Sequence, residues 1–146
     1  MFTQPLMLSG FNIISIICDI MDRYEKGKKS LEDIQKRSVE EIFKDLEDIA
    51  PDLSRFVVEF PYSEIYTREE VDLKIREICT VAALTVLGTI PQLKDHINAA
   101  LNVGNTPVEI VEIIMQMSAY CGFPKAINAV VAAKEVFTER ELLPIE

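Results

Sequence analysis

A long, nearly uncharged stretch in the second half of this chain limits what the chain can fold into. Residues 80–137 carry seven charged side chains in 58 positions, whereas the whole chain of 146 residues holds 15 basic and 24 acidic ones. Seven charges are too few to coat a fully solvated surface. We therefore expect this stretch to be the core of one domain, or to be an interface between subunits as well.

Composition excludes several classes of protein. With 146 residues and 49% hydrophobic residues, the chain can bury a core without disulfides. A net charge of −9 argues against a nucleic-acid-binding protein, which needs a basic face. Cys18, Cys79 and Cys121 form no CxxC pair, and the single histidine excludes a His-rich metal site within one chain. We expect these cysteines to be buried, in a reducing, cytoplasmic compartment.

The uncharged run over residues 1–18 is the only candidate for a membrane or targeting segment. It contains polar residues and lacks a basic start, so we expect neither a transmembrane span nor a signal peptide. We expect a helix that packs on the domain or on another subunit, with an interfacial or partner-binding helix as the alternative.

Glycine and proline positions predict helices throughout, and no strand pair joined by a tight turn is visible. Four glycines follow apolar segments, as residues after a helix end do, and four prolines stand where segments begin; these are Gly27, Gly88, Gly104, Gly122, Pro51, Pro91, Pro107 and Pro124. We expect a connection over 61–66 and helices over 31–49, 53–60, 68–87, 91–103, 107–121 and 124–139. Ser30 with Asp33, Thr67 with Glu70 and Thr106 with Glu109 supply cap signatures.

The last two predicted helices are apolar nearly all round. Polar side chains in 107–121 form one narrow stripe at Glu109, Glu112 and Gln116, and 124–139 repeats this pattern. A chain of this size cannot bury both helices so fully by itself. We therefore predict an oligomer whose interface uses them.

Glu77 and His96 are the residues best suited to proton transfer. Glu77 has mostly apolar neighbours one turn away, which makes it a candidate proton carrier; alternatively its carboxylate reaches solvent or pairs with Arg76 or Lys74. His96 borders an apolar face and can exchange protons near neutral pH, or it is a structural residue. At 1.5 Å per residue the two lie roughly 16 and 8 Å from the turn at Gly88, so direct contact does not follow. A water bridge, strongly crossing helices or pairing across a subunit boundary would be needed to join them.

An ordered series of motifs between Phe56 and Phe137 resembles the carboxymuconolactone decarboxylase family. The matching segments are Leu73–Ile78, Ala82–Leu84, Leu87-Gly88, Pro91–His96, Ala99–Gly104, Thr106-Pro107, Glu109-Ile110, Glu112, Gln116, Tyr120–Pro124 and Ala126–Ala129. The resemblance implies an all-α, alkylhydroperoxidase-D-like bundle of about six or seven helices that assembles as a homo-trimer or hexamer. We place the domain that carries the resemblance over 51–146 and an N-terminal helical extension over 1–50, the two forming one compact unit.

The resemblance also implies a choice between two chemistries. The redox branch carries a CxxC whose positions are Thr89 and Gln92 here, so dithiol peroxidase activity is not expected. The lactone decarboxylase branch implies a lyase that needs no metal or organic cofactor and acts on a small carboxylated lactone. His96 would then move the proton, Glu77 would orient or charge His96, and Gln92, Arg76 and Lys94 would bind the substrate.

Two other functions stay open. One is an antioxidant, peroxiredoxin-like protein that consumes hydroperoxides through isolated cysteines. The other is an oligomeric binding protein without catalysis. The shared fold does not by itself decide among these functions.

Overall fold

The computed structural model describes the backbone of residues 13–145 and the side chains of residues 22–145. This part holds no strand and seven α-helices, which confirms the all-α prediction: α1 (Ile13–Gln35), α2 (Val39–Phe43), α3 (Pro51–Val57), α4 (Leu73–Leu87), α5 (Ile90–Asn102), α6 (Pro107–Cys121) and α7 (Phe123–Glu139). A 3-10 turn, η1 (Lys44–Leu46), and a π-helix, η2 (Val58–Ile65), complete it. No helix in residues 13–145 is long and apolar enough to cross a membrane. Residues 1–12, in the uncharged run, lie outside the described part.

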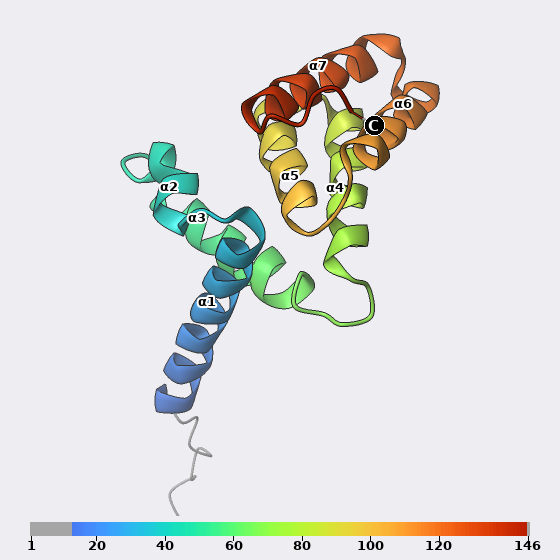
Figure 1. Cartoon of the computed structure of the whole chain (residues 1–146). Helices are drawn as coiled ribbons and strands as arrows, with labels where there is room; N and C mark the ends of the chain where they lie inside the picture. The colour runs from blue at the N-terminus through green and yellow to red at the C-terminus, as the bar shows by residue number, and fades with distance from the viewer. Residues whose placement is uncertain (1–12, 146) are drawn as a thin grey trace, which may run out of the picture.

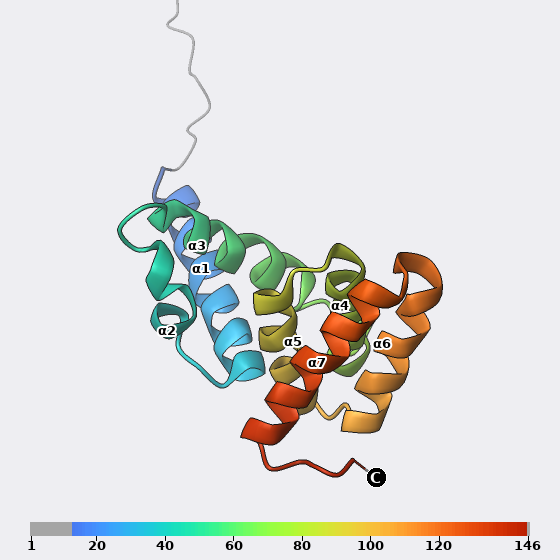
Figure 2. The same ribbon diagram turned by 90° about the horizontal axis from the view of Figure 1, so that it is seen from above.

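The helices form two groups, each with its own hydrophobic core (Figure 1, Figure 2). The larger core lies among α4–α7 and includes Leu93, Ile97 and Phe137. The smaller core joins α1, α2 and η2 to α5, through residues such as Leu31, Val58 and Ala99. Helix α5 therefore contributes residues to both cores and lies where the two groups meet.

The first helix differs from the prediction. A helix over 31–49 beginning at Ser30 is wrong: α1 runs through Gly27 and Ser30 to Gln35, and a separate helix α2 begins after Ser38 with a complete capping box. Gly27 is a packing position, because a Cβ there would collide with the main-chain carbonyl of Val58. The missing side chain allows the backbone of η2 to approach α1 closely, and this contact keeps the helix intact.

The segment between residues 51 and 72 also differs. The predicted connection over 61–66 is wrong, since α3 continues into η2 through Pro61, where the Tyr66 amide donates to the Pro61 carbonyl at 2.9 Å. The predicted start of a helix at 68 is wrong as well. Thr67 donates back to Ser63, and Asp72 caps α4 by accepting from the Ile75 amide at 2.8 Å.

The helices predicted over 91–103, 107–121 and 124–139 are confirmed to within one residue at each end, as α5, α6 and α7. Gly88 ends α4 in the left-handed region with φ of 79°, and the Thr106–Glu109 capping box opens α6. The outer faces of α6 and α7 leave apolar side chains exposed in the single chain: Met115, Tyr120, Phe123, Ile127 and Val131.

Candidate functional site

A cavity of about 370 Å³ lies between the two groups of helices. The N-terminal elements α1, α2, α3 and η2 supply one wall, and α4 and α5 supply the other. The wall is largely apolar with a few polar groups, as in small-molecule sites. Its lining residues are Leu31, Gln35, Ile42, Phe43, Val57, Pro61, Tyr62, Tyr66, Thr80, Gln92, Asp95 and His96.

Glu77 and His96 contact each other directly at this cavity. His96 Nδ1 lies 2.8 Å from Glu77 Oε2, so the two meet directly within one chain, which helical rise alone did not predict. The expected positions differ by about 8 Å along the helical hairpin. The two side chains nevertheless meet across α4 and α5, so a separation calculated from helical rise alone is a poor guide to contact here. The alternative that Glu77 pairs with Arg76 or Lys74 is also wrong, because its partner is His96.

The environment of the pair is strongly asymmetric. Glu77 is fully buried, whereas His96 keeps 19% of its side chain exposed and lines the cavity. Because Nδ1 faces Glu77, Nε2 is the ring nitrogen that a ligand in the cavity can reach. The second carboxylate oxygen of Glu77, Oε1, is buried without a hydrogen-bond partner among the described residues.

Two tyrosines stand beside the pair. The rings of Tyr62 and Tyr66 stack with centroids 4.9 Å apart, and the Tyr66 hydroxyl lies 3.0 Å from Thr80 Oγ1. Burial raises the pKa of Tyr62 to about 12. Burial also raises the pKa of Tyr66 well above its ordinary value, and the negative charge of Glu77 adds to the rise. Both phenols are therefore neutral hydrogen-bond donors near neutral pH.

The other predicted site residues divide into two sets. Gln92 lines the cavity near His96. Arg76 and Lys94 do not line it: Arg76 donates to the main-chain oxygens of Val71 and Arg68, and Lys94 pairs with Glu135 on α7. No cationic side chain lines the cavity within the described part of the chain, apart from His96 when it is protonated.

Neither described cysteine lines this cavity. Cys79 is exposed on the outer side of α4, where it lines a smaller pocket with Arg76, so the expectation that it is buried is wrong. Cys121 is partly exposed at the end of α6, and the side chain of Cys18 lies outside the described part. Between residues 22 and 145, no group of three or more His, Cys, Asp or Glu side chains could hold a metal ion.

Sequence reasoning missed several lining residues. Gln35, Tyr62 and Tyr66 lie before residue 73, in the part of the chain where the predicted helix boundaries are wrong. Tyr62 and Tyr66 stand four residues apart, the spacing of side chains that share one helix face, and this was the available signal. Thr80 and Asp95 gave no signal, because a single hydroxyl or carboxylate on a helix is ordinary.

Comparison with known proteins identifies the relationship. A model of the carboxymuconolactone decarboxylase family matches residues 51–135. The chain is 30% identical to 4-carboxymuconolactone decarboxylase from Acinetobacter baylyi, over 84% of this chain and 92% of that protein. It is 34% identical to an uncharacterised 15.0 kDa protein from Paracoccus denitrificans, over 66% and 73% of the two chains. It is 25% identical to the nitrosuccinic acid decarboxylase npaB from Metarhizium robertsii, over 57% and 58%. The protein belongs to the carboxymuconolactone decarboxylase family, which confirms the resemblance seen in its sequence.

Proposed function

We propose that the protein is a lyase that removes CO₂ from a small carboxylated lactone by proton transfer. The observation that carries the proposal is the buried Glu77–His96 pair at the wall of a cavity of small-molecule size. Two relatives named as decarboxylases, one acting on 4-carboxymuconolactone and one on nitrosuccinic acid, support the reaction class. Both names describe small carboxylated molecules, so the proposed substrate is of that kind.

The proposed reaction uses the geometry of the pair. The bond between the carboxylate carbon and the ring carbon breaks, CO₂ leaves, and the electron pair spreads into the conjugated carbonyl as a dienolate. His96 then gives a proton from Nε2 to a carbon of the dienolate, and solvent returns a proton to the ring. Glu77, bound at Nδ1, holds the orientation of the ring and compensates its charge while it is protonated. Gln92 lies on the cavity wall where its amide can donate to a substrate oxygen.

Arg76 and Lys94 have no substrate-binding role in the proposed mechanism. Both side chains are held on other surfaces by the contacts described above, and neither lines the cavity. Gln92 is therefore the residue from the predicted binding set to which we assign a role.

Substitution of the pair tests the proposed function. With 4-carboxymuconolactone as the first substrate, we expect His96→Gln and Glu77→Gln each to lower kcat by about 10²- to 10⁴-fold, the range of general acid–base catalysis. Each change removes one partner of a buried pair, so the thermal unfolding midpoint is measured alongside kcat to show that the variant is folded. Glu139→Gln, an exposed change at the end of α7, is the matched control and should keep full activity. Undiminished turnover in His96→Gln would overturn the assigned role.

We further propose that the chain forms an alkylhydroperoxidase-D-like bundle over 51–146 with a helical extension over 1–50, and that it acts in the cytoplasm. In this proposal copies of the chain assemble as a trimer or hexamer. The exposed apolar residues of α6 and α7 support the assembly, because a patch of this kind on a small domain is typical of an interface. The exposed thiol of Cys79 fits a reducing compartment.

A further inference from the structure

We propose that Tyr66 is a further catalytic residue, whose hydroxyl donates a hydrogen bond to the substrate oxygen on which negative charge develops as CO₂ leaves. This inference rests on the proposed function and adds a group for the developing anion. Proton transfer by His96 does not by itself stabilise that anion before the proton arrives.

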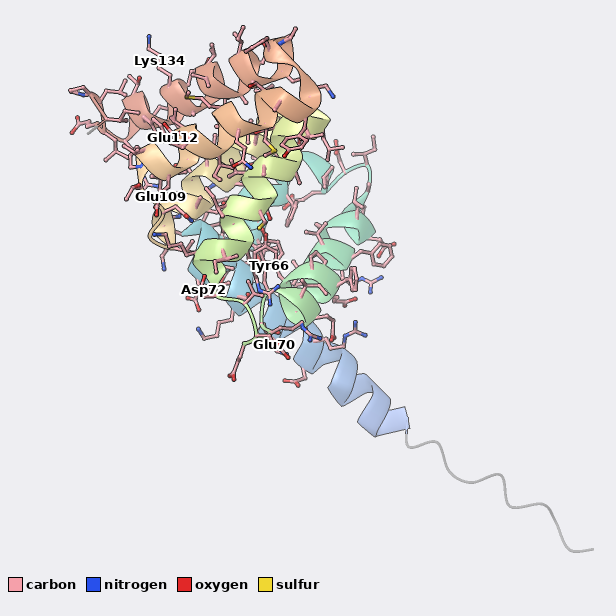
Figure 3. The ribbon with its side chains drawn as sticks, turned by 90° about the vertical axis from the view of Figure 1, so that its right-hand side faces the viewer. Tyr66, Glu70, Asp72, Glu109, Glu112 and Lys134 are labelled. Atoms are coloured by element: carbon pink, nitrogen blue, oxygen red, sulfur yellow. The ribbon has the colours of Figure 1, made fainter. Side chains whose placement is uncertain are left out.

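The position of Tyr66 is fixed from two directions. It directly follows η2 and lines the same cavity as His96. Its ring stacks on Tyr62 at an angle of 23° between the ring planes, and its hydroxyl is bound to Thr80 on α4. Figure 3 shows Tyr66 beside α4. A donor held in place before the reaction loses little conformational entropy when it acts.

The hydrogen atoms of the two hydroxyls can be arranged in two ways. Thr80 Oγ1 lies 3.0 Å from the Arg76 carbonyl oxygen and 3.0 Å from the Tyr66 hydroxyl. In the first arrangement Thr80 donates to the carbonyl and Tyr66 donates to Thr80. In the second, Thr80 donates to Tyr66, which frees the phenol hydrogen for another acceptor, either a substrate oxygen or the neighbouring carboxylate of Glu77. Tyr66 can therefore serve the substrate without losing Thr80 as a partner, and the donation from Thr80 strengthens the bond that Tyr66 makes.

The charges around the cavity create the need for such a donor. Asp95 lines the cavity and Glu77 is buried behind His96. Apart from His96, no lining side chain in the described part is basic, so any further stabilisation of the developing anion comes from neutral donors. Burial keeps Tyr66 protonated by raising its pKa. It is thus a hydrogen-bond donor at the pH where the enzyme would work.

Three variants test this inference. Tyr66→Phe keeps the ring and its stacking and removes the hydroxyl; we expect kcat to fall by about 10²- to 10³-fold, with KM changed by less than about threefold. Thr80→Val nearly preserves shape and removes the partner hydroxyl; we expect kcat to fall by about tenfold. Tyr120→Phe, an exposed phenol on α6, is the matched control and should keep the parent kcat.

The outcomes separate this inference from the proposed function. Parent turnover together with unchanged kcat in Tyr66→Phe overturns the role of Tyr66 and leaves that of His96 standing. A loss confined to KM or to the thermal unfolding midpoint also overturns it, because that pattern indicates a structural role. If Tyr66→Phe does not fold, Thr80→Val decides: unchanged kcat in that variant overturns the inference. Absence of turnover in the parent protein overturns both proposals.

Discussion

Tyr62 connects the ionisation of a single residue to the stability of the folded chain. It is 5% exposed, and burial raises its pKa to about 12, compared with 10.0 for a free side chain. Below pH 10 the phenol is neutral in both folded and unfolded states. Above pH 10 the unfolded phenol ionises while the folded one stays neutral, so the free energy of unfolding falls as pH rises towards 12.

We expect this residue to contribute a loss of about 1 kcal/mol between pH 9 and pH 11. Tyr62→Phe removes the ionisation, so its free energy of unfolding should fall less steeply over that range than that of the parent protein. Urea unfolding of both proteins at pH 9, 10 and 11 measures this difference in slope. The other titrating groups contribute equally to both proteins, so their effects cancel. Parallel curves would show that Tyr62 is not shielded from solvent as described.

Residue types were easier to predict than the contacts between them. The apolar neighbours of Glu77 were visible in the sequence, and they do bury the carboxylate. Its contact with His96 was not visible, because helical rise gives positions along a helix and not the reach of side chains across a hairpin. The role of the tyrosine pair depends on how η2 winds, and local propensity does not specify a π-helix.

Among the elements, α1 shows how a glycine can be misinterpreted. Gly27 has the sequence context of a helix end, and a glycine within a helix costs about 1 kcal/mol relative to alanine. We nevertheless expect Gly27→Ala to lower the free energy of unfolding by about 1–3 kcal/mol, because the new Cβ would force η2 away from α1. Ser30→Ala, on the same helix, is the control. Because Ser30 lies inside α1, its replacement by alanine should leave the free energy of unfolding unchanged or raise it slightly. If Ser30 were an N-cap, the same change would lower it by about 1 kcal/mol.

Chemical denaturation of the two variants measures both effects. A gain in stability for Gly27→Ala would contradict the close approach of Val58 to α1.

Helix ends were predictable where groups close in sequence fix them. Helices α4 to α7 have ends fixed by local groups such as Gly88 and Thr106, whereas α1 and η2 are fixed by each other.

At the scale of the whole molecule, the N-terminal segment has a structural role that its sequence did not reveal. Its charged residues predicted little beyond a solvated surface. In the fold, α1 and α2 place Leu31, Gln35, Ile42 and Phe43 on the cavity wall opposite His96. A sequence analysed in separate segments cannot show this, because residues of both groups of helices line the cavity. Figure 2 shows the two groups side by side.

The outer face of α6 and α7 leads to a prediction about assembly. Phe123 and Ile127 are 73% and 59% exposed in the single chain, and they line a groove of about 300 Å³ with Met115 and Val131. If copies of the chain pack through this face, a charge at its centre must be desolvated without a partner, which a subunit interface does not tolerate. We expect sedimentation to give a trimer or hexamer for the parent protein and a smaller species for Ile127→Glu. Ile49→Glu introduces the same charge at a residue that is 78% exposed away from this face, so it should keep the parent mass. Equal masses for the parent protein and Ile127→Glu would place the interface elsewhere or show that the chain acts alone.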